Sequence, residues 1–140
     1  ETRPQQNRDS VEGRDYSAWI LMYLDRWKEA QERYEGLLKG SPSEIGYICN
    51  CGALAARLGE REKALGYSKQ LAEVKTPFLF GEPAYLRALI AACLGEKEEA
   101  VNLLRLAISQ GYAYPNIHGS SALELLRDYP PYIQLMKPKG

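Results

Sequence analysis

The sequence predicts an all-α fold in which three helical hairpins stack side by side and a C-terminal segment caps the stack. Three observations support this prediction: a seven-residue motif recurs, its copies are about 34 residues apart, and small and apolar residues repeat at the same offsets. Such a period is typical of repeats made of two antiparallel helices, whose apolar faces are buried only when neighbouring repeats stack.

The recurring motif reads LGEREKA at 58–64 and LGEKEEA at 94–100, with a weaker copy, LDRWKEA, at 24–30. Its final alanines are 34 and 36 residues apart. The same offsets relate four further sets: Ala18, Gly52 and Ala88; Ile20, Leu54 and Ile90; Leu24, Leu58 and Leu94; and Leu37, Leu71 and Ala107. We expect the small residues where paired helices approach closely, and the apolar ones in the core.

Each unit reads as a helix of about a dozen residues, a tight turn and a second helix. The turns fall at Asp25, Gly59 and Gly95. Glycine suits such a turn because a left-handed backbone there costs no Cβ clash.

Two junctions separate the units. In the first, Ser41–Glu44 (Ser-Pro-Ser-Glu) predicts a capping box, with serine as the cap and proline at the first helical position. The second, Thr76–Pro83, carries two extra residues. We expect Phe78 and Phe80 to tuck into this junction and Pro83 to open the next helix.

The chain resembles the tetratricopeptide family over roughly Val11 to Gln110. The residues that carry the likeness are Ala18, Gly52, Ala88, Ala30, Ala64, Ala100, Tyr34 and Pro42. The resemblance implies a right-handed α-α superhelix and a role in protein binding. Two features depart from the family pattern: the usual tryptophan position holds Arg14, Ile48 and Ala84, and Arg87 stands where leucine is preferred.

The tail is similar to the end of tetratricopeptide regions in bacterial signalling proteins, namely serine/threonine kinases and winged-helix regulators. The likeness lies in Leu125–Tyr132 and Lys137–Gly140. It implies that the chain is, or derives from, the non-catalytic C-terminal part of such a protein.

The residues of the tail also predict a cap without that lineage. Ser121 and Glu124 read as a second capping box. The apolar residues expected to cover the third unit are Leu123, Leu126, Tyr129, Tyr132, Ile133 and Met136. In the alternative interpretation, Tyr129–Tyr132 (Tyr-Pro-Pro-Tyr) is a polyproline-type ligand.

The predicted organisation has a flexible N-terminal segment (1–13), three repeats within 14–110 (about 11–44, 45–80 and 81–110) and a capping segment (111–140). The sequence starts at Glu1, so we expect a processed or shortened chain. Its compartment stays open between the cytoplasm and export after processing.

Composition argues against two classes of partner. Eighteen basic and eighteen acidic side chains cancel, so no strong field favours nucleic acid. The most apolar stretch, Ala84–Leu94, is interrupted by Arg87 and is too short to span a bilayer.

Little in the sequence predicts catalysis, and we expect a non-enzyme without cofactor or metal. Cys49, Cys51 and Cys93 lack the spacing of a zinc motif and are expected to be small packing residues. A disulfide from Cys49 or Cys51 to Cys93 is the alternative. The single histidine, His118, lies in a predicted loop, and an enzyme would need it beside Asp128 or Glu124.

The family resemblance implies a concave groove lined by the first helix of each unit. Its positions correspond to Asp15, Trp19, Met22, Tyr23, Cys49, Ala53, Ala56, Arg57, Glu82, Tyr85, Leu89 and Cys93. We expect an apolar peptide or amphipathic helix to bind there, with Trp19, Met22, Tyr23, Cys49, Ala53, Arg57, Tyr85 and Leu89 as contacts. The alternative is a structural subunit of a larger, multi-subunit assembly that packs through its outer surface and tails.

Overall fold

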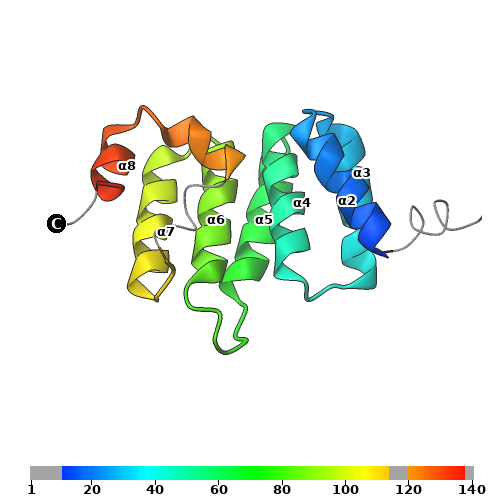
Figure 1. Ribbon diagram of the computed structural model, residues 1–140, viewed down its shortest axis with the longest axis horizontal. Coiled ribbons are helices and arrows are strands. Elements are labelled where there is room, and N and C mark those ends of the chain that lie inside the picture. The colour runs from blue at the N-terminus through cyan, green and yellow to red at the C-terminus, as the bar shows by residue number, and fades with distance from the viewer. Residues whose placement is uncertain (1–10, 114–119, 138–140) are drawn as a thin grey trace, which may run out of the picture.

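The computed structural model describes residues 11–113 and 120–137, and this part of the chain is helical without any strand. Its six long helices form hairpins: α2 (Val11–Tyr23) with α3 (Trp27–Gly40), α4 (Ile45–Arg57) with α5 (Arg61–Ala72), and α6 (Glu82–Cys93) with α7 (Lys97–Ser109). The 3-10 helix η2 (Ser121–Leu126) and the short helix α8 (Pro130–Leu135) follow. Figure 1 shows the hairpins in a row, with α2 and α3 at one end and α8 at the other. The prediction of an all-α fold is confirmed.

The three hairpin turns share one geometry. Asp25, Gly59 and Gly95 adopt positive φ angles of 60°, 80° and 80°. In each turn the next backbone N–H donates to the carbonyl five residues earlier, at 2.8 to 3.0 Å: Arg26 to Leu21, Glu60 to Ala55 and Glu96 to Ala91. This pattern is the Schellman ending of a helix, and its recurrence at the predicted positions makes the three hairpins alike at their turns.

Small residues mark the places where helices approach most closely. Ala18, Gly52 and Ala88 are all buried. A Cβ atom on Gly52 would lie 2.5 Å from Ile90 Cδ1 and 3.1 Å from Tyr67 Cβ, so α4 packs tightly on both α5 and α6. This close packing explains why the repeat requires a small residue at this position.

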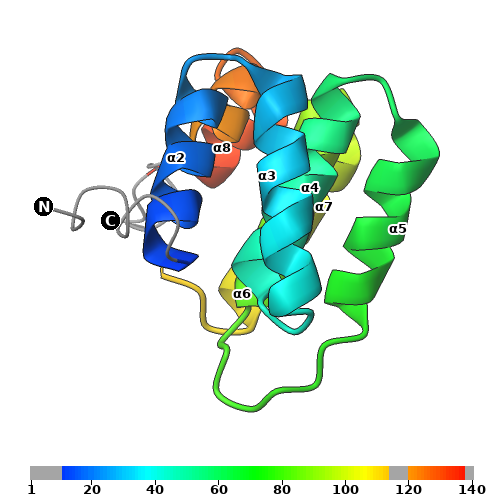
Figure 2. The same cartoon turned by 90° about the vertical axis from the view of Figure 1, so that its right-hand side faces the viewer.

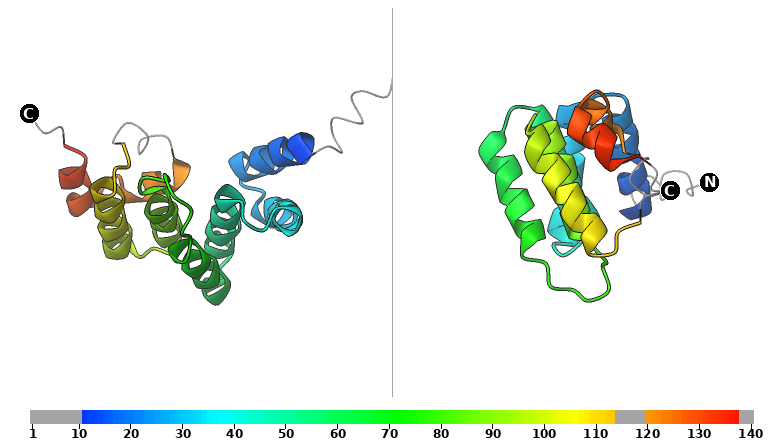
Figure 3. Two further views of the ribbon diagram at one scale, coloured as in Figure 1. Left: turned by 90° about the horizontal axis from the view of Figure 1, so that it is seen from below. Right: turned by 90° about the vertical axis from the view of Figure 1, so that its left-hand side faces the viewer.

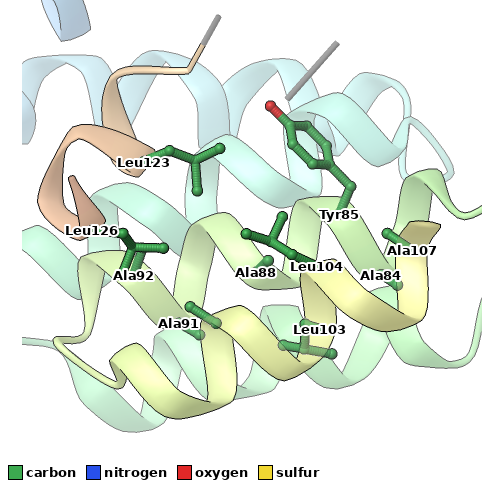
Figure 4. Close-up of a cluster of buried hydrophobic side chains, with 11 residues drawn as sticks. Ala84, Tyr85, Ala88, Ala91, Ala92, Leu103, Leu104, Ala107, Leu123 and Leu126 are labelled. Carbon is green, nitrogen blue, oxygen red and sulfur yellow. The ribbon is translucent and has the colours of Figure 1, made fainter. Parts of the chain in front are cut away.

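The core consists of three apolar clusters, one at each seam of the stack. The first joins α2 and α3 to α4, the second joins α4 and α5 to α6, and the third joins α6 and α7 to η2. Figure 4 shows the third cluster, in which Leu123 and Leu126 of η2 lie over α6 beside Ala88 and Ala92. Each hairpin therefore buries its apolar faces against its neighbours.

A buried polar side chain links the first two hairpins. Gln31 of α3 is fully buried, and its amide nitrogen donates to Glu60 Oε1 at the start of α5. Its amide oxygen accepts a hydrogen bond from Lys28 Nζ at 3.2 Å. The bond from Gln31 lowers the pKa of the Glu60 carboxyl because it stabilises the charged form.

Different helices lie on the two sides of the row of hairpins. Figures 2 and 3 show α2 and η2 on one side of the stack and α5 on the opposite side. Helix α4 packs directly against α6, whereas α2 packs mainly against α3. At the two ends of the stack, α2 and η2 therefore lie on the same side, and α4 and α6 lie between them.

The C-terminal segment covers the last hairpin, with η2 on α6 and α8 on α7. Leu123 and Leu126 are buried as expected. Ile133, however, is 45% exposed, and Leu135 packs against the cluster in its place. Pro130 and Pro131 begin α8 and are helical, so the structure does not present them as a polyproline ligand.

Both predicted capping boxes are wrong. The N-cap of α4 is Glu44, whose carboxylate accepts from the Gly46 N–H at 3.3 Å. Ser41 instead ends α3, where its N–H donates to the last carbonyls of that helix, so it cannot also open α4. The cap of η2 is Ser120 and not Ser121, because the Ser120 hydroxyl accepts from the backbone N–H two residues on.

The expectation that Phe78 and Phe80 tuck into the second junction is also wrong. Phe78 is 81% and Phe80 is 63% exposed, and both have positive φ angles. The backbone of Gly81 lies against the Ala107 carbonyl, so the main chain approaches α7 closely at this junction. Pro83 lies in the first turn of α6, as predicted.

Helix α2 begins at Val11, inside the N-terminal segment (1–13) that was predicted to be flexible. Residues 11–13, expected in that segment, form the first turn of α2, and residues 1–10 lie outside the described part of the chain. The paired helices fall within the three predicted repeat ranges.

A pair of glycine substitutions tests this packing. Gly81→Ala should destabilise the fold by roughly 2–4 kcal/mol, because φ is +85° and a Cβ would overlap the Ala107 carbonyl oxygen. Gly66→Ala should stabilise it by about 0.5–1 kcal/mol, because its site in α5 is open and helical. Urea unfolding followed by circular dichroism measures both changes, and equal stabilities of the two variants would contradict the packing at Gly81.

Candidate functional site

A cavity of about 220 Å³ lies where the two ends of the stack face each other. Its floor comes from α4 and α6, and its walls come from the end of α2, the start of α3 and the start of η2. Figure 3 shows how these helices are arranged along the stack. The described residues that line it are Met22, Tyr23, Asp25, Trp27, Cys49, Asn50, Ala53, Arg57, Leu89, Cys93, Ser120, Ser121 and Ala122. The lining is mostly apolar, with a single cation and a single carboxylate.

Arg57 is the cation of this cavity. It ends α4, where the helix dipole favours positive charge, and its guanidinium carbon lies 5.2 Å from the centre of the Trp27 ring. In the described part of the chain Arg57 forms no ion pair with a carboxylate. The Trp27 ring and a hydrogen bond with the Cys93 side chain hold the guanidinium in place, and no described carboxylate neutralises its charge.

Two thiols border the cavity and both are poor nucleophiles. Cys49 is buried, and burial raises the pKa of its thiol strongly. Burial also raises the pKa of Cys93, although the neighbouring Arg57 partly offsets this rise. Because the thiolate is the reactive form, neither cysteine resembles a catalytic nucleophile.

The third cysteine lies on the other side of α4. Cys51 is fully buried in the first core cluster, and burial raises its pKa to about 12. All three cysteines are free thiols, so the alternative of a disulfide is not realised in the structure. The expectation that cysteines act as packing residues is confirmed for Cys49 and Cys51, while Cys93 is half-buried.

The structure brings most of the expected groove residues together. Those that line the cavity are Met22, Tyr23, Cys49, Ala53, Arg57, Leu89 and Cys93. Trp19 lies outside it on the exposed face of α2, where its ring stacks on Tyr23 at a centroid distance of 5.6 Å.

Tyr85 is not available to a partner, contrary to expectation. It is 7% exposed and belongs to the third core cluster (Figure 4). Its ring stacks on Tyr112 at a centroid distance of 4.4 Å and an interplanar angle of 17°. Burial, reinforced by the neighbouring Tyr112, raises the pKa of Tyr85 to about 12. The segment after α7 thus covers a position that the family resemblance assigns to the groove.

Several cavity residues were not predicted. Trp27 and Asn50 belong to the repeats but not to the groove positions that the family resemblance implies. Ser120 and Ala122 come from the capping segment, which folds back over α6. No sequence signal places this segment at the same cavity as α2, although a tryptophan directly after a predicted turn could have drawn attention to Trp27.

The structure adds no chemical centre to this cavity. Within the described residues no group of three or more histidine, cysteine, aspartate or glutamate side chains could hold a metal ion. His118 lies outside the described residues. None of the described helices has the length and apolar character needed to cross a membrane.

Comparisons with protein-family models, curated protein sequences and solved structures found no match. Any functional conclusion for this chain must therefore come from its own residues and their arrangement.

Cysteine alkylation tests the geometry of the cavity. In the native protein at pH 7.5, iodoacetamide should modify Cys93 first, because Cys49 and Cys51 are buried with raised pKa values. Peptide mapping by mass spectrometry measures the order of modification, and Cys93→Ser should remove the first adduct. Equal rates at Cys49 and Cys93 would contradict the burial of Cys49.

Proposed function

We propose that this chain is a tetratricopeptide-like superhelix that binds a protein or peptide partner and catalyses no reaction. The proposal rests on one observation: all three hairpins and the capping segment contribute residues to one mostly apolar cavity. Among its described lining residues Arg57 is the single cation. In line with the tail resemblance, the module would belong to the non-catalytic part of a bacterial signalling protein.

The size of the cavity favours a peptide side chain as its occupant. Pockets that enclose drug-sized ligands measure roughly 300–1,000 Å³. At about 220 Å³ this cavity is smaller, and it suits one anchoring side chain of a larger partner. Interfaces commonly bind through such buried anchors.

The lining indicates what kind of anchor fits. Met22, Leu89 and Ala53 offer apolar surface, while Arg57 stands at the edge of that surface without a carboxylate partner in the described chain. An apolar side chain with an acidic group nearby would satisfy both features. The raised pKa values of the bordering thiols favour recognition over nucleophilic chemistry.

Filling the cavity should abolish binding. Ala53→Phe places a ring in the space that the anchor needs and should weaken a bound peptide at least about tenfold. Peptides would be selected from a phage-displayed random library against the wild-type chain, and affinities measured by fluorescence polarisation.

Ala72→Phe, an exposed site at the end of α5, is the matched control and should bind as the wild type does. Thermal melts of both variants would check that the fold is intact. Unchanged affinity of the Ala53→Phe protein for every selected peptide would refute the proposed site.

A second candidate function, as a subunit of a larger assembly, draws on the loop between α5 and α6. Phe78 and Phe80 are exposed there, with ring centroids 6.3 Å apart. Exposed apolar side chains side by side are typical of contact surfaces.

If this loop mediates assembly, the isolated chain should associate at high concentration, and Phe78→Ser with Phe80→Ser should restore the monomer. Multi-angle light scattering over a concentration series measures this. A monomer at every concentration would count against self-assembly through the loop.

A further inference from the structure

Three aromatic side chains form a ladder along the outer face of α2. We call Tyr16, Trp19 and Tyr23 the aromatic ladder; their exposed fractions are 65%, 51% and 75%. The first two rings have centroids 6.3 Å apart at 28°, and the next two are 5.6 Å apart at 22°. Stacking on one another orders these large side chains before any partner binds, so little side-chain entropy is lost on binding.

The polar groups of the ladder are unused. In the described part of the chain no hydrogen bond involves the hydroxyls of Tyr16 and Tyr23 or the indole N–H of Trp19, and each ring stacks on its neighbour in the ladder. A partner that meets this face must therefore offer flat apolar surface together with hydrogen-bond acceptors.

The ladder is continuous with the cavity. Tyr23 belongs both to the ladder and to the cavity lining, so a peptide whose anchor enters the cavity passes directly onto α2. From Tyr16 to Tyr23 the ladder spans seven residue steps of helix, or about 10.5 Å along the axis.

A polyproline II helix has the chemistry and the length that this face requires. It makes no internal hydrogen bonds, so its carbonyls are free acceptors, and its proline rings pack flat on aromatic side chains. It rises about 3.1 Å per residue with three residues per turn, so the two prolines of a Pro-x-x-Pro segment lie on one face about 9.3 Å apart. This distance matches the span of the ladder.

We propose that the aromatic ladder binds a proline-rich segment of the partner in the polyproline II conformation. The inference rests on the proposed function and names the partner's class. Single-stranded nucleic acid also stacks on aromatic rings, but it requires a basic groove. The chain has no net charge, and among the described residues the cavity that continues the ladder has one cation, Arg57.

Labelled decaproline is the direct probe. Fluorescence polarisation should show saturable binding of fluorescein-labelled decaproline, and an alanine-rich helical decapeptide with the same label should bind at least about tenfold more weakly. Trp19→Ala should weaken decaproline binding by about tenfold or more, because it removes the central ring. Trp19→Phe, which keeps a ring but loses the N–H, should lie between Trp19→Ala and the wild type.

Leu106→Ala is the control, because it removes a side chain of α7 that is 41% exposed and lies outside both the ladder and the cavity lining, and it should leave decaproline affinity unchanged. Absence of decaproline binding, equal binding of the helical peptide, or an unchanged affinity of Trp19→Ala would each overturn the inference. If library-selected peptides still bind in a manner that Ala53→Phe abolishes, the proposed function stands while this inference falls. If no peptide of either kind binds, both fall.

Discussion

The close approach of α4 to α5 and α6 is the constraint on which the rest of the structure depends. Gly52 allows it, because any side chain there would overlap Ile90 and press on Tyr67. This packing brings α4 and α6 side by side as a continuous floor. Without that floor neither the middle core cluster nor the cavity above it would exist.

The cavity results from the two ends of the stack rather than from the repeat itself. A regular array would continue with equivalent helices on both sides, but here α2 packs mainly on α3, while η2 closes the other end over α6. These two elements contribute different residues to the walls of the cavity, with Met22 and Tyr23 from α2 and Ser121 and Ala122 from η2. Arg57 and Trp27, which come from different hairpins, meet at this point.

Burial also decides which side chains remain chemically available. The buried cysteines are held in the thiol form, while the aromatic ladder and the phenylalanines of the α5–α6 loop are exposed. These exposed aromatic groups are the kind of side chain on which the proposed binding role relies. Surfaces of this kind recognise partners by shape, by apolar area and by a few well-placed polar groups.

By itself the sequence determined the helices, the three turns and the positions of the small residues, because these depend on local periodicity and on backbone preferences that repeat with the motif. The groove positions that the family resemblance implies were also enough to bring Met22, Ala53 and Leu89 to one site.

Only the tertiary structure decided that Tyr85 is covered by Tyr112, that Trp27 supports Arg57, and that the capping segment forms a wall of the cavity. The exposure of Phe78 and Phe80 in the second junction is likewise a result of the tertiary structure. Such contacts join segments far apart along the chain or depend on how the ends of the stack close, and no local pattern encodes either of these.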